Sequence, residues 1–333
     1  MKADGYGLGI GPVGGTLWHA GCRRFFVAYL EEGIALRRAL PGPAEIYVLD
    51  GLMGGDTAGF LDAHGLVPVL NTPDDIARWG EHARRKGGRK AILSVDTGML
   101  RLGLSAAEVA ALGDDASPLD GIEIEYVMSH LASAENSSDP RNETQRRRFE
   151  EARGLLPAAK GSIANSAGTF LGVPFHYDLC RPGAALFGVS RSTGALTPMK
   201  QVVGLKGKIL QVRVVDSESA VGYGATCRVP AGARLATVAA GYADGYLRAL
   251  SNRGHGYAGG VRVPVVGRIS MDLITFDISD VPEGAIGPGS DIDLLCAEHT
   301  VDDLAEEAGT IGYEILTALG SRYRRIYTGG PAA

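Results

Sequence analysis

Short β-branched and apolar runs alternate with helix-like segments through the first 190 residues, and this alternation restricts the fold more than any other feature. We expect seven strands, at 25–28, 45–49, 67–70, 91–95, 124–128, 161–164 and 184–189. Helical patterns lie between them, for example at 31–39, 73–85 and 145–156. Strands that alternate with helices at intervals of about 20 to 35 residues are typical of βα units around a parallel sheet.

The count of strands bears on the start of the chain. A (β/α)8 barrel needs eight parallel strands, and the seven above leave one to be found. The sequence opens with Met1 and Lys2, where a preceding strand would be ending. We therefore predict an α/β chain with a TIM-like (β/α)8 barrel whose first strand is truncated.

The pattern changes after about residue 197. Strand-like runs at 207–215, 234–240, 261–266, 273–278 and 291–295 are separated by Gly, Pro and Asp turns, and two helices are expected at 301–308 and 311–319. Such a run of strands with little helix between them indicates a mainly antiparallel β domain. The polar segment Ser192–Pro198 reads as the linker, so we expect a barrel domain at 1–197 and a β domain at 198–333.

Composition excludes several classes of function. The chain has 33 basic and 38 acidic residues, and the resulting charge of −5 without a basic face argues against nucleic acid as a partner. No apolar stretch is long enough to span a bilayer, and the first residues contain no signal-peptide core. The four cysteines are widely spaced, which predicts neither a zinc site nor a disulfide framework and favours a cytoplasmic location.

Candidate reactive groups follow from the barrel itself, since active groups in such folds gather at the carboxyl ends of the strands. Lys2, Arg101 and His130 stand at such ends, and Arg181 precedes the last expected strand. Residues 165–168 (NSAG) offer a hydroxyl and backbone N–H groups that suit an anion such as phosphate. A lysine opposite a phosphate site is what a pyridoxal-phosphate barrel needs. A solvated surface lysine and a packed histidine remain open on these grounds alone.

Several motifs taken together resemble one family. Residues 2–9 (KADGYGLG), 95–103 (VDTGMLRLG), 163–168 (IANSAG) and 181–183 (RPG) resemble the lysine, arginine, phosphate-loop and ring-nitrogen motifs of the alanine racemases. In the second domain, 222–226 (GYGAT), 241–246 (GYADGY), 267–272 (GRISMD) and 313–316 (YEIL) continue the resemblance in order. The match extends across nearly the whole chain.

The resemblance implies a function and a mechanism. The chain would be a pyridoxal 5′-phosphate-dependent isomerase that interconverts L- and D-alanine and supplies D-alanine for peptidoglycan. Lys2 would hold the cofactor covalently and act as one base, and Tyr223 would act as the other. Because the two bases stand on opposite faces, Tyr223 would come from the partner subunit of a homodimer.

The resemblance also assigns supporting roles. Arg181 would face the ring nitrogen, and His130 would link Arg181 to Tyr223 and lower the pKa of that phenol. Arg101, Met271 and Tyr242 would bind the substrate, with Tyr242 favouring a side chain as small as methyl. The remaining cofactor contacts would come from Tyr6, Asn165, Ser166, Gly183, Ala184 and Tyr313.

Other functions remain to be distinguished. The same motifs fit a broad-specificity or serine racemase, or an inactive relative truncated at its N-terminus. A barrel-type decarboxylase would be expected to carry Glu where Arg181 stands. A single-domain pyridoxal-phosphate-binding homeostasis protein would lack the domain that carries Tyr223 and Met271.

Overall fold

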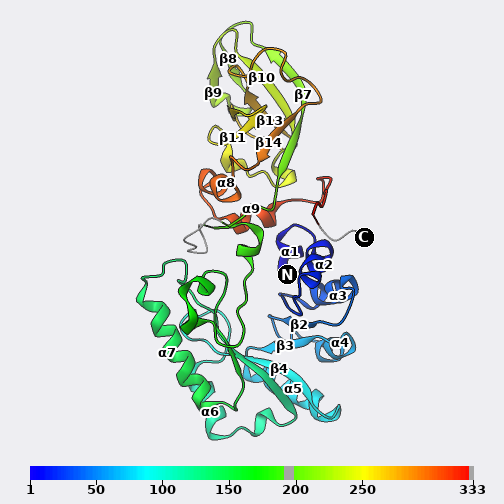
Figure 1. The fold of residues 1–333 in the computed structure, drawn as a ribbon, viewed down its shortest axis with the longest axis vertical. Coiled ribbons are helices and arrows are strands. Elements are labelled where there is room, and N and C mark those ends of the chain that lie inside the picture. The colour runs from blue at the N-terminus through cyan, green and yellow to red at the C-terminus, as the bar shows by residue number, and fades with distance from the viewer. Residues whose placement is uncertain (191–198, 330–333) are drawn as a thin grey trace. The chain divides into compact units, whose positions relative to one another are not determined.

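The computed structural model describes residues 1–190 and 199–329, which divide into two compact units (Figure 1). The first contains 1–186 and 327–329, and the second contains 187–190 and 199–326. The expected linker at 192–198, and with it the expected boundary between 197 and 198, lies outside the described residues. No helix within the described part is long and apolar enough to cross a membrane.

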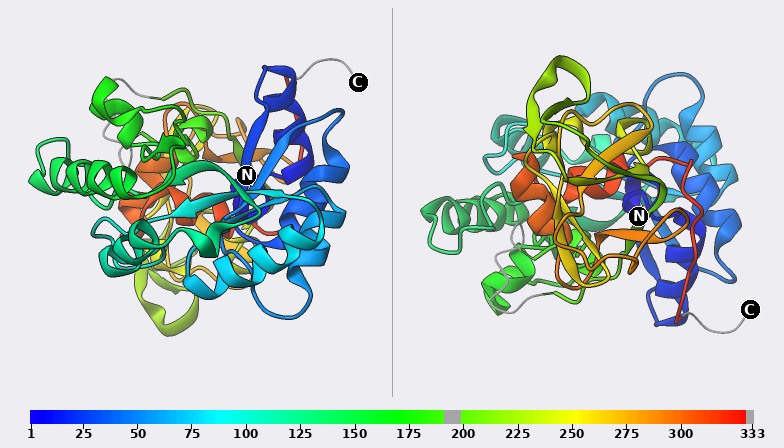
Figure 2. Two further views of the ribbon diagram at one scale, coloured as in Figure 1. Left: turned by 90° about the horizontal axis from the view of Figure 1, so that it is seen from below. Right: turned by 90° about the horizontal axis from the view of Figure 1, so that it is seen from above.

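The first unit is built on a parallel sheet of six strands, which pair in chain order. These strands are β1 (Arg24–Val27), β2 (Glu45–Val48), β3 (Val67–Leu70), β4 (Arg89–Ser94), β5 (Ile122–Met128) and β6 (Lys160–Ser162). The helices of this unit are α1 (Lys2–Tyr6), α2 (Ile10–His19), α3 (Leu30–Ala39), α4 (Thr57–Ala63), α5 (Pro73–Arg85), α6 (Ala106–Asp114) and α7 (Pro140–Leu155). Figure 2 shows the helices around the outside of the strands. The sheet is curled like part of a barrel wall, which confirms the predicted barrel-type architecture.

Side chains along each strand point alternately to the two faces of this sheet, and both faces are buried. Tyr47, Val69, Ile92, Tyr126 and Met128 pack together on one face as a compact apolar cluster. Their neighbours along the strands pack on the other face against the helices. This double burial explains why the strands read as nearly continuous apolar runs rather than alternating ones.

Local capping chemistry explains where two of the helices begin. The Thr72 hydroxyl accepts a hydrogen bond from the Asp75 amide at 3.1 Å, with Pro73 at the first helical position of α5, as predicted. The predicted start of α7 at residue 145 is wrong. Helix α7 begins five residues earlier, because Asp139 caps it by accepting from the Arg141 amide at 2.9 Å and Pro140 follows it.

The seventh predicted strand, at 184–189, is also wrong. Residues Ala184–Phe187 form a short 3₁₀ helix, η4. Its backbone is turned away from strand pairing because the Ser166 hydroxyl accepts from the amides of Gly183 and Ala185. The Leu186 amide then closes a tight turn onto the Gly183 carbonyl at 2.9 Å.

The second unit is an antiparallel sheet with the strand order β12-β11-β14-β7-β10-β13, beside the hairpin β8-β9. The strands are β7 (Leu205–Val214), β8 (Ser219–Val221), β9 (Cys227–Val229), β10 (Arg234–Ala239), β11 (His255–Ala258), β12 (Val261–Pro264), β13 (Leu273–Asp277) and β14 (Asp291–Leu295). Two helices follow, α8 (Val301–Ala308) and α9 (Gly312–Ala318). The mainly β second domain is confirmed, although β8, β9 and β11 were not predicted.

Candidate functional site

Lys2 begins a left-handed turn rather than an ordinary helix. The segment drawn as α1 has positive φ at Ala3, Asp4 and Gly5 (52°, 51° and 63°), and Tyr6 continues it at 58°. This conformation costs roughly 1–2 kcal/mol for each residue that is not glycine. Strain of this kind persists only where surrounding contacts hold it, and it is frequent at functional sites.

Glu32 supplies those contacts. One carboxylate oxygen accepts from the Ala3 amide at 2.6 Å, and the other accepts from the Ala28 amide at 2.8 Å and the Tyr29 amide at 3.3 Å. The amino nitrogen of Met1 donates to the Phe26 carbonyl at 2.7 Å. A single carboxylate therefore joins the turn that carries Lys2 to the carboxyl end of β1 and the start of α3.

Lys2 shares its surroundings with groups from two other strand ends. Burial raises the pKa of Asp50, which follows β2, while the positive charges of Lys2 and Arg101 favour its ionised form. Arg101 itself is exposed, in the loop after β4. The Asp96 carboxylate shapes that loop by accepting from the amides of Gly98 and Met99, both at 2.9 Å.

His130 follows β5 and is held in one orientation by Asn165. The Asn165 amide nitrogen donates to the Leu131 carbonyl at 3.2 Å and lies 3.3 Å from His130 Nε2, while its oxygen accepts from the Gly168 amide at 2.8 Å. Since that nitrogen can only donate, Nε2 is the acceptor, and the neutral ring carries its proton on Nδ1. Burial, and after it the positive charges of Arg181, Arg101 and Lys2, together lower the pKa of His130 to about 3.

Arg181 lies beside the carboxyl ends of β5 and β6. Its guanidinium donates to the Ser129 carbonyl at 2.6 Å and to the Ser162 hydroxyl, and it lies 5.9 Å from the centre of the Phe26 ring. Burial lowers its pKa to about 10, so the group remains charged at neutral pH. Within the described part of the chain, its hydrogen bonds go to these serines rather than to His130, which the sequence had suggested as its partner.

Three polar groups converge beside Gly183. The Gly183 amide donates to the Ser166 hydroxyl at 2.8 Å, and a Cβ at Gly183 would stand 2.1 Å from the Tyr6 hydroxyl. Any larger residue at 183 would therefore displace Tyr6. Because the Ser166 oxygen already accepts amide hydrogens, its own O–H can be donated to an anion. Ala184 follows directly and is fully buried.

The remaining predicted residues belong to the second unit. Tyr223 opens the short helix η6 (Tyr223–Ala225), and 72% of its surface is exposed. Positive φ angles at Gly222 and Gly224 make the sharp bend that projects it. Tyr313 is the second residue of α9 and is half-buried.

Tyr242 and Met271 stand side by side in this unit, and both are exposed. The Tyr242 amide donates to the Ser270 carbonyl at 3.1 Å. A Cβ at Gly241 would lie 2.3 Å from the Met271 carbonyl oxygen, so only glycine permits this approach. The buried Asp244 carboxylate accepts from the Gly241 amide at 2.9 Å and holds the turn.

The structure thus gathers Lys2, Arg101, His130 and Arg181 at one edge of the first unit, and it gathers the phosphate-loop residues beside Tyr6. Glu32 and Asp50 were missed by sequence reasoning. A signal existed for each, since Glu32 stands at the third position of a helix, where it can reach back to the preceding backbone, and Asp50 directly follows a strand.

Each half of the chain matches a known protein-family model. A family model described as alanine racemase, N-terminal domain, matches residues 1–191, and one described as alanine racemase, C-terminal domain, matches residues 202–327.

Individual relatives are similar over nearly the whole chain. An alanine racemase of Rhodospirillum rubrum is 49% identical over 330 residues, which are 99% of this chain and 88% of the relative. A catabolic alanine racemase of Agrobacterium fabrum is 47% identical over 328 residues, 98% of this chain and 84% of the relative. A crystal structure of alanine racemase from Bartonella henselae, with covalently bound pyridoxal phosphate, has a TM-score of 0.92 at 39% identity and covers 98% of this chain and 90% of that chain.

The Glu32 contacts generate a prediction about the Lys2 turn. Glu32→Gln replaces one acceptor oxygen by a donor, so either the Ala3 or the Ala28 amide loses its partner. We expect a loss of about 1–3 kcal/mol in the free energy of unfolding and faster hydrogen exchange at the Ala3 amide or at the Ala28 amide. Glu31→Gln changes the exposed neighbour and serves as the control. Unchanged exchange in Glu32→Gln would contradict the proposed restraint.

His130 generates a prediction about pH. Its pKa falls from 6.5 to about 3 on folding, so below about pH 6.5 the unfolded chain takes up a proton that the folded chain does not. Stability should therefore decline as the pH falls through this range, and His130→Gln should make the decline shallower. Denaturant titrations at about pH 7 and about pH 5 measure the difference, with the exposed His19→Gln as the control. An equal loss of unfolding free energy between about pH 7 and about pH 5 in all three proteins would contradict this prediction.

Proposed function

The chain belongs to the alanine racemase family, and on that premise we propose that it interconverts L- and D-alanine with pyridoxal 5′-phosphate held by its first unit. The observation that carries this proposal is the convergence of Tyr6, Ser166 and Gly183 at one point, in the unit that also presents Lys2 and Arg181. The covalently bound pyridoxal phosphate of the Bartonella henselae relative supports the choice of cofactor.

The residues present fit the phosphate end of this cofactor. Two hydroxyls, of Tyr6 and Ser166, stand beside a glycine whose missing side chain leaves the backbone approachable. We place the phosphate there, with Ala184 and Tyr313 completing its contacts and Asn165 holding the loop. Lys2 would form the covalent bond to the cofactor, which when bound supplies the electron sink that makes the α-proton of alanine removable.

Arg181 has a distinct task in this proposal. Its guanidinium is held in place by Ser162 and Ser129 and stays charged at neutral pH. A fixed positive charge opposite the ring nitrogen disfavours a proton on that nitrogen. Arg181 would thereby moderate the electron-withdrawing power of the ring and limit side reactions.

Inversion of a stereocentre requires a proton to leave one face and arrive at the other. We propose that Lys2 serves one face and that Tyr223 of the partner subunit serves the other, in a homodimer with shared sites. The exposure of Tyr223, Tyr242 and Met271 supports this, because three such side chains on one unit suit contact with another surface.

Three residues would recognise the substrate. We propose that Arg101 and the Met271 backbone receive the alanine carboxylate, and that Tyr242 limits the side chain to about the size of a methyl group. We further propose that the enzyme works in the cytoplasm and supplies D-alanine for peptidoglycan.

The first test addresses the lysine. Lys2→Ala should remove the visible absorbance of the covalently held cofactor and lower alanine racemisation by several orders of magnitude. Lys86→Ala, at an exposed lysine of the same unit, should change neither. Wild-type absorbance in Lys2→Ala would show that another group holds the cofactor.

The second test addresses the shared site. Tyr223→Phe should suppress exchange of the α-proton with solvent deuterium more strongly from L-alanine than from D-alanine. When inactive Lys2→Ala and Tyr223→Phe chains are mixed, half of the dimers should be mixed and one of their two sites intact, restoring about a quarter of wild-type activity. No recovery in a mixture shown to contain mixed dimers would place both bases in one chain.

A further inference from the structure

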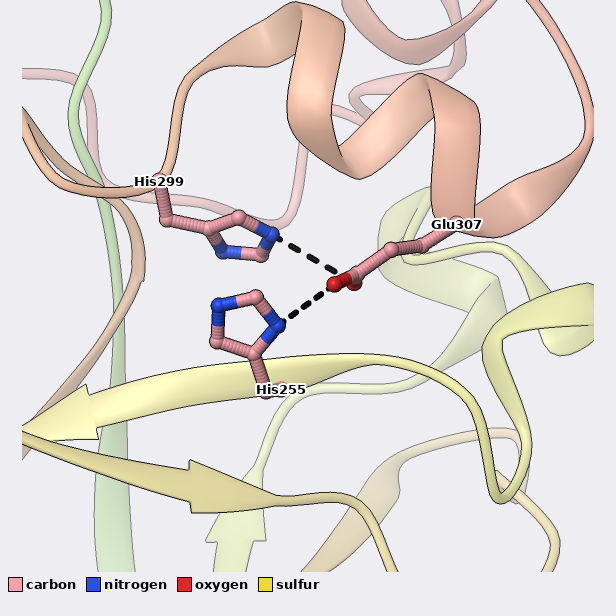
Figure 3. A group of neighbouring side chains, drawn as sticks. All are labelled: His255, His299 and Glu307. Atoms are coloured by element: carbon pink, nitrogen blue, oxygen red, sulfur yellow. Dashed lines mark hydrogen bonds and ion pairs between the residues drawn. The ribbon is translucent and has the colours of Figure 1, made fainter.

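Three side chains of the second unit that the racemase proposal does not use point toward one another (Figure 3). His255 lies on β11, His299 precedes α8, and Glu307 lies in the last turn of that helix. His255 Nδ1 is 2.5 Å from Glu307 Oε1, and His299 Nε2 is 3.4 Å from Glu307 Oε2. The two imidazole rings are stacked with their centres 4.0 Å apart.

The hydrogen bonding of this cluster is incomplete. His299 has no exposed surface, and no described protein group hydrogen-bonds to either of its ring nitrogens. Glu307 Oε2 is also buried without a hydrogen-bond partner among the described residues, and it lies 3.4 Å from His299 Nε2. Leaving such groups unsatisfied costs about 1–3 kcal/mol each, and more for a charged carboxylate. Buried nitrogens and a carboxylate aimed at a shared point therefore suggest an additional ligand.

We propose that His255, His299 and Glu307 form a binding site for a divalent transition-metal ion, with Zn²⁺ as the best match. Two imidazoles and a carboxylate are a common zinc-ligand set, in which a water molecule takes the fourth position. The ion would join β11 to α8 and stabilise the second unit.

The geometry is close to what an ion requires. Each residue offers one ligand atom, and these atoms lie within 4.8 Å of one another, so a central point lies about 2.8 Å or less from all three. Zinc–nitrogen and zinc–oxygen bonds are about 2.0–2.2 Å long, so side-chain rotations of less than about 1 Å would bring the three atoms to bonding distance. His255 Nδ1 and Glu307 Oε1, now 2.5 Å apart, would separate to admit the ion. His255 can bind the ion as a neutral imidazole, because its ring proton can move from Nδ1 to Nε2, so binding requires no net loss of a proton from the ring.

One neighbouring charge opposes the ion. An Arg262 guanidinium nitrogen lies 3.2 Å from His255 Nδ1. Arg262 is exposed on β12, so its side chain can move into solvent when a cation enters. This competition predicts that Arg262→Ala binds the metal more tightly than the wild type.

The test uses the cofactor-loaded enzyme after treatment with EDTA and removal of the chelator. Calorimetric titration with ZnCl₂ should show about one equivalent per chain, and CoCl₂ should give the visible spectrum of a four-coordinate site. Glu307→Gln, at a partly exposed position that should preserve the fold, should weaken Zn²⁺ binding at least about ten-fold. His299→Gln should abolish it.

Matched controls separate this site from surface binding. Glu283→Gln removes an exposed carboxylate of the same unit, and His19→Gln removes an exposed imidazole of the other, so both should bind Zn²⁺ like the wild type. At one zinc concentration, zinc should raise the melting temperature of the wild type more than that of Glu307→Gln. Absence of saturable binding in the wild type, or equal affinity in Glu307→Gln, would overturn the proposal and leave the cluster as a hydrogen-bonded triad.

Discussion

The parallel pairing of β1 to β6 is the constraint on which the rest of the first unit depends. Since all six strands run the same way, every strand end delivers its next residues to one edge of the sheet. Lys2 beside β1, Asp50 after β2, Arg101 after β4 and His130 after β5 come together for this reason. Their mutual electrostatic influence on Asp50 and His130 is a direct product of the topology.

Much of the secondary structure could be predicted from the sequence, because the signals for strands and helix ends are local. Five strands of the second unit and the start of α5 follow from apolar runs and capping residues. The seventh strand of the first unit could not be predicted in this way. Its composition suits a strand, but the Ser166 hydroxyl takes two of the nearby amides, and that contact joins residues far apart in the chain.

The same distinction between local and long-range signals applies to the candidate site. Motif resemblance identified Lys2, Ser166 and Arg181, whose chemistry is visible in the sequence. It did not identify Glu32, which matters because its carboxylate reaches three backbone amides in the folded chain. Nor did it identify the cluster of His255, His299 and Glu307, whose members are spread over some fifty residues of sequence. It also suggested a bond between His130 and Arg181, where the folded chain uses Asn165 and two serines instead.

The left-handed turn after Lys2 has a consequence for how this protein can vary. Ala3, Asp4 and Tyr6 occupy a backbone region that β-branched residues avoid, so Val, Ile and Thr are disfavoured at these positions whatever their chemistry. The restriction comes from backbone geometry, not from contact with any small molecule. In a library of variants of this segment, substitutions that cannot adopt the left-handed backbone would therefore be lost through misfolding before any effect on catalysis is seen. The active variants would report on which residues this backbone accepts as much as on which residues catalysis needs.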